Sequence, residues 1–298
     1  MIRPIEASER IGSLDFLRGV AILGILFINI ENFAYPDSWN PWKYGFEIEA
    51  DRDARFWVYF LTQGKFYNMF TLLFGEGFYM FLVRLERKNL GLTASDIYAR
   101  RLLWLFIIGV IHAYFIWSGD VLYHYAICGL FLFPFRSMSK KWLLFSALIL
   151  ALLQLNKTYD RTKQRAESYT NYLELKDLPK NHLTEKENKR VNYWDEKLTQ
   201  KSADTSYVEP PKHTYWKGRD ETYKSASVHK GRFYYQGGIF STLMMMIIGI
   251  LLYRMGIFHD YRSIKYYWVL SIGLLILGLG ISYLRYDHWT YDYARPII

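Results

Sequence analysis

The sequence has only one cysteine, Cys128, among its 298 residues. This scarcity excludes an internal disulfide and a cysteine-based metal cluster, and the sequence also lacks the His-Glu-x-x-His spacing of a zinc site. It contains no glycine-rich phosphate loop and no internal repeat. Basic residues are diluted by acidic ones, so the charge pattern does not predict a nucleic-acid partner. We therefore expect neither a metal cofactor nor a nucleic-acid function.

Apolar residues are concentrated in runs longer than any globular core requires. Taking about 20 apolar residues for one bilayer crossing, we predict an all-α, polytopic membrane protein with about seven transmembrane helices. The predicted spans are residues 14–33, 66–83, 102–117, 121–135, 142–155, 238–255 and 266–283. The first run has no small-residue cleavage site, which predicts an uncleaved anchor helix.

A long polar segment divides the chain into three predicted parts. They are an N-terminal helix bundle (1–155), a polar extracytoplasmic insert (156–236) and a C-terminal helix pair (237–298). The insert is rich in Lys, Glu, Asp and Tyr, which is typical of a solvated, partly helical loop. Tyrosines and cations also suit sugars and anionic lipid head groups, so a lid or an acceptor-binding element is the alternative interpretation.

Lys and Arg gather in alternate short loops, and this asymmetry predicts the orientation. Basic clusters lie between spans two and three, between spans four and five, and between spans six and seven. The positive-inside rule makes this side cytoplasmic, so the N-terminus is predicted inside and the insert outside.

Two polar motifs lie near the predicted cytoplasmic side. Asp15 and Arg18 are three residues apart in span one and share a helix face. Glu76 lies between Gly75 and Gly77 in span two. A lone charge is costly in lipid, so we predict that Arg18 and Glu76 lie close together or line one polar cavity. A purely structural ion pair is the alternative.

A second group of polar residues lies near the predicted outer side. Asn29 is in the outer part of span one, and His112, Asp120 and His124 flank a two-residue turn. The short turn makes spans three and four antiparallel neighbours, so the last three residues are predicted to converge. A carboxylate beside an imidazole fixes its tautomer, as a general base requires. For each histidine, an interhelical hydrogen bond is the alternative.

Six segments form an ordered set of motifs: residues 10–30, 64–66, 72–78, 100–113, 118–126 and 246–256. This set resembles the YeiB family of bacterial membrane proteins. The resemblance implies a multi-pass protein of the bacterial cytoplasmic (inner) membrane. It also implies a further block of membrane helices that this sequence does not contain, so we expect a truncated or naturally short member.

The motif around Arg18 also looks like that of larger transmembrane acyltransferases, including the heparan-alpha-glucosaminide N-acetyltransferases and the acyltransferase-3 group. Those proteins pass an acyl group from a cytoplasmic thioester to an acceptor on the far side. The resemblance implies acyl-CoA as the donor, with its phosphates near Arg18, Arg100 and Arg101. It implies a glycan or lipid acceptor outside the cell.

This chain departs from the acyltransferase pattern at the expected base. The acyltransferase-3 histidine, eleven residues after the first-helix arginine, is replaced by Asn29. We therefore predict that His112 is the general base, with Asp120 and His124 beside it. Two other classes stay open: a transporter or permease with a buried polar path, and a non-catalytic membrane protein whose insert binds a partner.

Overall fold

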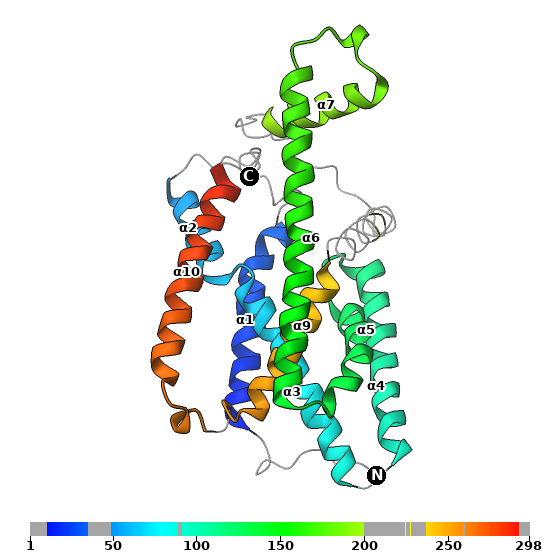
Figure 1. Ribbon diagram of the computed structural model, residues 1–298, viewed down its shortest axis with the longest axis vertical. Coiled ribbons are helices and arrows are strands. Elements are labelled where there is room, and N and C mark those ends of the chain that lie inside the picture. The colour runs from blue at the N-terminus through cyan, green and yellow to red at the C-terminus, as the bar shows by residue number, and fades with distance from the viewer. Residues whose placement is uncertain are drawn as a thin grey trace. The chain divides into compact units, whose positions relative to one another are not determined.

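The computed structural model describes residues 11–34, 49–88, 91–199, 224, 227, 237–258 and 260–291. Every regular element in these residues is helical (Figure 1), which confirms the all-α prediction. The elements are α1 (Gly12–Ala34), α2 (Glu49–Thr62), α3 (Lys65–Arg87), α4 (Leu92–Ile111), the π-helix η3 (His112–Ile116), α5 (Leu122–Leu132), η4 (Phe133–Arg136), α6 (Lys140–Leu175), η5 (Lys180–His182), α7 (Glu185–Thr199), α9 (Gly238–Arg254), η6 (Tyr261–Ser263) and α10 (Tyr267–Tyr291). Most of the C-terminal half of the predicted insert, from residue 200 to 236, lies outside the described residues.

Each of the seven predicted spans lies on a helix, but the helices differ in length. Five segments are long and apolar enough to cross a membrane: Gly12–Glu31, Glu49–Arg87, Leu92–Ile116, Lys140–Leu175 and Tyr267–Asp287. The apolar helix α9 has 17 residues. Helix α5 has 11, about 16 Å by helical rise, which is shorter than a bilayer core. The number of crossings therefore stays a prediction.

The long helices expose apolar side chains as lipid contact requires. None of the most apolar window of α10 is buried, and only 11% of that of α6 is buried. In water this surface would be unfavourable, whereas in a bilayer the acyl chains cover it and the helices satisfy their own backbone hydrogen bonds. The described chain is therefore a helical membrane protein.

Helix α6 continues beyond the predicted span, which ends at residue 155. Its 36 residues extend about 54 Å by helical rise, well beyond a hydrocarbon core of about 30 Å. The polar C-terminal part of α6 is followed by α7, whose Trp194 is buried with Val191 against Tyr172 of α6. The described part of the insert is thus a helical pair with its own small apolar cluster.

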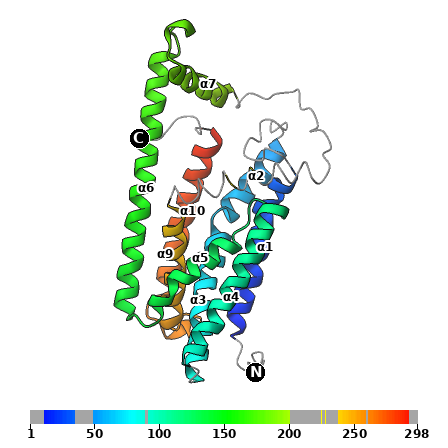
Figure 2. The same ribbon diagram turned by 90° about the vertical axis from the view of Figure 1, so that its right-hand side faces the viewer.

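The chain divides into two compact units. The first comprises Met1–Ile22, Phe66–Lys157 and Lys212–Tyr267, and the second comprises Leu23–Lys65, Thr158–Pro211 and Trp268–Ile298. In the first unit α5 lies between α4 and α9 (Figure 2).

Glycines let two pairs of helices approach backbone to backbone within the first unit. A β-carbon on Gly75 of α3 would collide with the backbone of Met246 on α9, and one on Gly249 of α9 would collide with the backbone of Leu72. A β-carbon on Gly109 of α4 would likewise collide with the backbone of α5. Small residues are the usual device for close helix packing in lipid, where no hydrophobic force draws helices together.

In the second unit, α2 packs on α10 through aromatic rings. The Phe56 ring lies 5.1 Å from that of Tyr286 and 6.2 Å from that of Tyr283, between centroids. Helix α2 ends just before Gly64, whose φ of 74° is a left-handed conformation that glycine adopts without strain. This turn lets α3 begin at Lys65.

Helix α7 begins with a capping box. Glu187 Oε2 accepts hydrogen bonds from Thr184 Oγ1 at 2.6 Å and from the Thr184 backbone N–H at 2.8 Å. These bonds favour the charged carboxylate, so they hold the pKa of Glu187 below its usual value. The contribution of Glu187 to α7 is therefore complete above the pKa of the unfolded chain, and it is lost as pH falls through the lower pKa of the folded helix.

We predict that acid will open α7 in the full chain before it opens the membrane helices. Hydrogen-exchange protection of the α7 amides should fall at pH values below the folded pKa of Glu187. Glu187→Gln should remove this pH dependence. Glu185→Gln, which removes a first-turn carboxylate and its exposed ion pair with Lys189 but no capping bond, should retain it, and equal behaviour of the two variants would contradict the capping role.

The glycine crossing between α3 and α9 gives a second prediction. Gly75→Ala should force α3 away from Met246 and destabilise the protein by about 1–3 kcal/mol or more, the usual cost of overpacking. Thermal unfolding of the purified protein in detergent measures this. Gly278→Ala on α10, where a β-carbon meets nothing within 4 Å, is the matched control, and equal unfolding midpoints would contradict the prediction.

Candidate functional site

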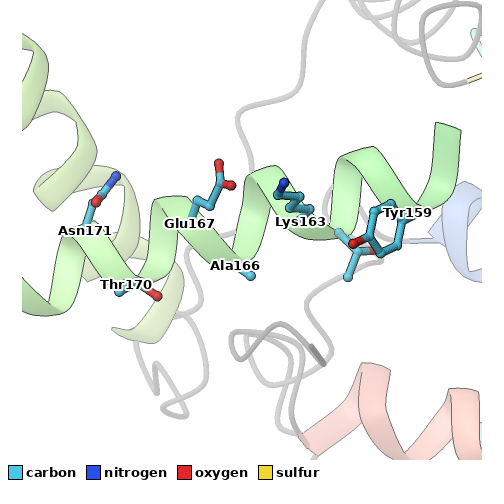
Figure 3. Close-up of a pocket in the computed structure, with 7 residues that line it drawn as sticks. Tyr159, Lys163, Ala166, Glu167, Thr170 and Asn171 are labelled. Carbon is cyan, nitrogen blue, oxygen red and sulfur yellow. The ribbon is translucent and has the colours of Figure 1, made fainter. Parts of the chain in front are cut away.

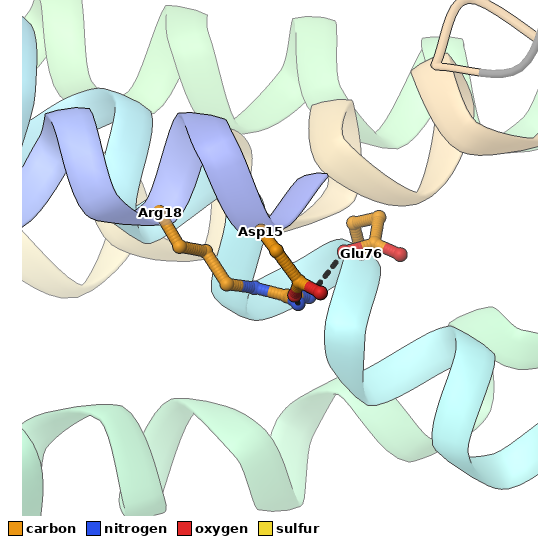
Figure 4. A network of polar contacts seen from close by, with 3 residues as sticks. All are labelled: Asp15, Arg18 and Glu76. Carbon is orange, nitrogen blue, oxygen red and sulfur yellow. Dashed lines mark hydrogen bonds and ion pairs between the residues drawn. The ribbon is translucent and has the colours of Figure 1, made fainter. Parts of the chain in front are cut away.

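A buried ion pair joins α1 to α3. Arg18 Nη2 donates to Glu76 Oε2 at 2.9 Å, and Arg18 Nη1 donates to Asp15 Oδ1 at 3.1 Å (Figure 4). Glu76 is fully buried, whereas the Arg18 side chain is 32% exposed. The predicted approach of Arg18 to Glu76 is thus confirmed, and Asp15 is the exposed member of the group.

The two glycines beside Glu76 serve different neighbours. Gly75 faces the backbone of α9, as described above. On Gly77 a β-carbon would lie 3.3 Å from Arg18 Nη2, so the absent side chain leaves room for the guanidinium. The Gly-Glu-Gly motif therefore places Glu76 between the close contact of α3 with α9 and the guanidinium of Arg18.

Only half of the Glu76 carboxylate is engaged. Its Oε1 is buried and has no hydrogen-bond partner in the part of the chain that the structure describes. A buried carboxylate oxygen without a donor is costly. Arg84 contributes a second favourable charge to Glu76, so two arginines act on this single acid.

A cavity of about 620 Å³ lies along α3 and α4 beside this pair. Three arginines contribute to its wall: Arg18, Arg84 and Arg101. Its other lining residues, apart from Gly77, are apolar or aromatic: Phe70, Leu73, Phe74, Phe78, Met80, Phe81, Tyr98, Leu102, Trp104, Leu105 and Ile108. A cavity of this composition suits a ligand with an anionic group and an extended, mostly apolar part.

The structure separates the arginines that the sequence grouped together. Arg101 lines the cavity with its guanidinium 4.8 Å from the Phe81 ring, whereas Arg100 is exposed and forms an ion pair with Asp96. The third arginine of the cavity wall, beside Arg18 and Arg101, is Arg84. Its spacing of seven residues from Gly77 puts both on one face of α3, and this spacing is the signal that could have identified it.

His112 and Asp120, which the sequence predicts near the outer side of the membrane, are in contact. His112 Nδ1 lies 2.8 Å from Asp120 Oδ2, and Asp120 Oδ1 accepts the backbone N–H of Leu122 at 2.9 Å. The His112 side chain is 34% exposed and that of Asp120 is 2% exposed. His112 begins the π-helical turn η3, a distortion that is frequent at functional sites.

His124 turns its Nε2 toward other partners. This nitrogen lies 2.9 Å from Thr242 Oγ1 on α9 and 3.6 Å from Cys128 Sγ. His124 is buried, and its contact with Thr242 is the interhelical hydrogen bond that the sequence left as its alternative role. Asn29 is half-buried on α1, in the part that belongs to the second unit.

A second cavity, of about 480 Å³, lies along the polar part of α6. The residues that line it fall on one helix face (Figure 3): Tyr159, Thr162, Lys163, Ala166, Glu167, Thr170 and Asn171. It contains no histidine and no cysteine. Within the described residues, no group of three or more His, Cys, Asp or Glu side chains could hold a metal ion. The cavity on α3 and α4 and the His112–Asp120 pair are therefore the candidate site.

The exposed apolar helices and the paired polar groups inside them define the class, a helical membrane protein. YxaH, an uncharacterised protein of Bacillus subtilis, is 42% identical over 163 residues, which are 51% of this chain and 39% of YxaH. An uncharacterised 39.9 kDa protein of Bacillus acidopullulyticus is 39% identical over 149 residues, 50% of this chain and 40% of that protein. The uncharacterised YeiB of Escherichia coli is 41% identical over 126 residues, 41% of this chain and 30% of YeiB.

These similarities confirm the resemblance to YeiB-like membrane proteins over the matched residues. The matched region of the chain covers less than half of the length of each of these relatives. No family model and no solved structure matches the chain.

Because Glu76 is buried and Asp15 is exposed, we predict that losing the Arg18–Glu76 contact lowers the stability of the protein much more than losing the Arg18–Asp15 contact. Arg18→Gln leaves Glu76 buried without its cation and should cost about 3–5 kcal/mol, whereas Asp15→Asn removes an exposed partner and should cost at most about 1 kcal/mol. Thermal unfolding in detergent compares them. The double variant Arg18→Gln/Glu76→Gln should recover part of the loss, and similar midpoints for Arg18→Gln and Asp15→Asn would refute the pairing.

Proposed function

We propose that this protein is a transmembrane acyltransferase, which moves an acyl group from a cytoplasmic acyl-CoA to a hydroxyl or amine acceptor outside the cell. The observation that carries the proposal is the His112–Asp120 contact near the end of a helix that also lines an arginine-bearing cavity. The resemblance to larger acyltransferases supports the same reaction. The inner membrane and the cytoplasmic N-terminus are part of the proposal, supported by the basic loops.

The extent of the cavity supports a route for the donor. Along α3 it is lined from Phe70 to Arg84, about 21 Å by helical rise. On α4 its lining ends at Ile108, four residues and about 6 Å before His112. Phosphates of the donor bound at Arg84 and Arg101 would leave its thioester arm to extend along the apolar walls toward His112.

The contact with Asp120 selects the tautomer of His112. A carboxylate only accepts hydrogen bonds, so the hydrogen lies on Nδ1 and the lone pair on Nε2 is available as a base. His112 Nε2 takes the proton of the acceptor hydroxyl or amine as its oxygen or nitrogen bonds to the thioester carbonyl carbon. The carbon–sulfur bond then breaks, and the thiolate receives that proton from His112. The products are the acylated acceptor and free coenzyme A.

A second function, proton-coupled transport, is supported by a different observation. Glu76 is fully buried, is held by Arg18 and leaves Oε1 without a partner in the described residues. A carboxyl group in this position can take up a proton and release the arginine. Uptake of a solute into vesicles that depends on Glu76, without covalent transfer, would favour this function.

Purified protein incubated with labelled acyl-CoA and candidate acceptors tests the catalytic role. His112→Ala should lower transfer by about 10²–10⁴-fold, the usual contribution of a general base. Asp120→Asn should also lower it, because an amide does not hold the tautomer. The control is His182→Ala, which changes an exposed histidine of η5, and equal transfer by wild type and His112→Ala would overturn the assignment.

A further inference from the structure

Two cations of the second unit meet where α3 begins beside α10. Lys65 Nζ donates to Ser282 Oγ of α10 at 2.8 Å and to the carbonyl oxygen of Phe60 at 2.5 Å. Arg285, on the same helix as Ser282, places Nη1 3.6 Å from the position that a β-carbon on Gly64 would occupy. The guanidinium therefore packs over the residue that precedes Lys65, and the two charges repel each other.

Neither cation has an acidic partner within the described residues. Lys65 bonds only to neutral oxygens, and no hydrogen bond or ion pair is recorded for Arg285. Glu31, an acid of this unit, is engaged elsewhere, because it accepts a hydrogen bond from Tyr59 at 2.9 Å and pairs with Arg55 at 3.5 Å. Two like charges in a medium of low polarity are unfavourable unless an anion joins them.

The place of the pair indicates the source of this anion. Lys65 is the first residue of α3, whose 23 residues rise about 34 Å, close to the thickness of a bilayer core. With α3 alone as the crossing, Lys65 lies at the membrane boundary. The rings of Phe56, Tyr283 and Tyr286 pack together on α2 and α10, and aromatic side chains of this kind are typical of the membrane interface.

Helix α10 provides an apolar track that leads away from Arg285. Leu277, Ile281 and Leu284 are spaced four and three residues apart, so they share one helix face that also includes Arg285. The three apolar side chains are between 58% and 68% exposed. An acyl chain can lie on this face while its head group reaches the cations.

We propose that Lys65 and Arg285 bind the phosphate of an anionic phospholipid, whose acyl chain lies along the exposed face of α10. The lipid supplies the negative charge that the described protein lacks at this point, and it fastens α10 to the joint between α2 and α3. Two adjacent cations between membrane helices suit the phosphate of an anionic head group. This site is independent of the acyl transfer proposed above.

Thermal unfolding of the full chain in lipid nanodiscs tests the site, because a ligand that binds the folded state raises the unfolding midpoint. Wild type should be more stable in discs that contain phosphatidylglycerol than in discs of phosphatidylcholine alone. Arg285→Gln should lose this difference, and Arg285→Lys should retain most of it. Arg285→Gln is preferable to a change at Lys65, since it leaves the bonds to Ser282 and Phe60 intact.

The matched control is Arg262→Gln, which removes the same charge from an exposed arginine of η6, just before the other end of α10. It should retain the full effect of phosphatidylglycerol. Equal effects of the lipid on Arg285→Gln and Arg262→Gln would overturn the proposal. A full shift produced by inorganic phosphate in phosphatidylcholine discs would overturn the lipid as the occupant.

Discussion

The arrangement of this protein depends on the pairing of charge inside a bilayer, and the Arg18–Glu76 contact is the clearest case. A fully buried carboxylate in lipid has no water to stabilise it, so a cation must lie within hydrogen-bond reach. A hydrogen-bonded ion pair needs a specific distance and orientation, whereas apolar contacts do not. It therefore determines how the first part of α1 lies against α3, with Gly77 leaving space for the guanidinium.

Close glycine contacts and polar bonds occur together in the first unit. Gly75 lets the backbone of α9 pack against α3 at the residue before Glu76. The close helix contact and the Arg18–Glu76 ion pair are therefore adjacent. Gly109 similarly brings the start of α5 onto α4, near the His112–Asp120 pair. In lipid, small residues and hydrogen bonds take over the role that hydrophobic attraction has in water. The candidate site thus follows from the helix packing and needs no separate scaffold.

Much of the fold and part of the site could be predicted from local patterns. The bilayer imposes length and apolar composition on each crossing separately, so every predicted span lies on a helix. The Arg18–Glu76 contact followed from the cost of lone charges, and the His112–Asp120 contact from a turn of two residues. Arg84 was not predicted, because in the sequence it looks like an ordinary loop charge. Only the continuation of α3 to Arg87 puts it on the cavity wall.

The sequence alone determined the class of protein, its helical segments and its costly intramembrane groups, because these depend on the composition of single segments in a known solvent. Tertiary structure decided which groups meet. Lys65 and Arg285 are far apart in the chain, and Arg100 and Arg101 are neighbours that face different surroundings. Such choices depend on how helices rotate and cross, and this is set by contacts between distant residues that no local pattern contains.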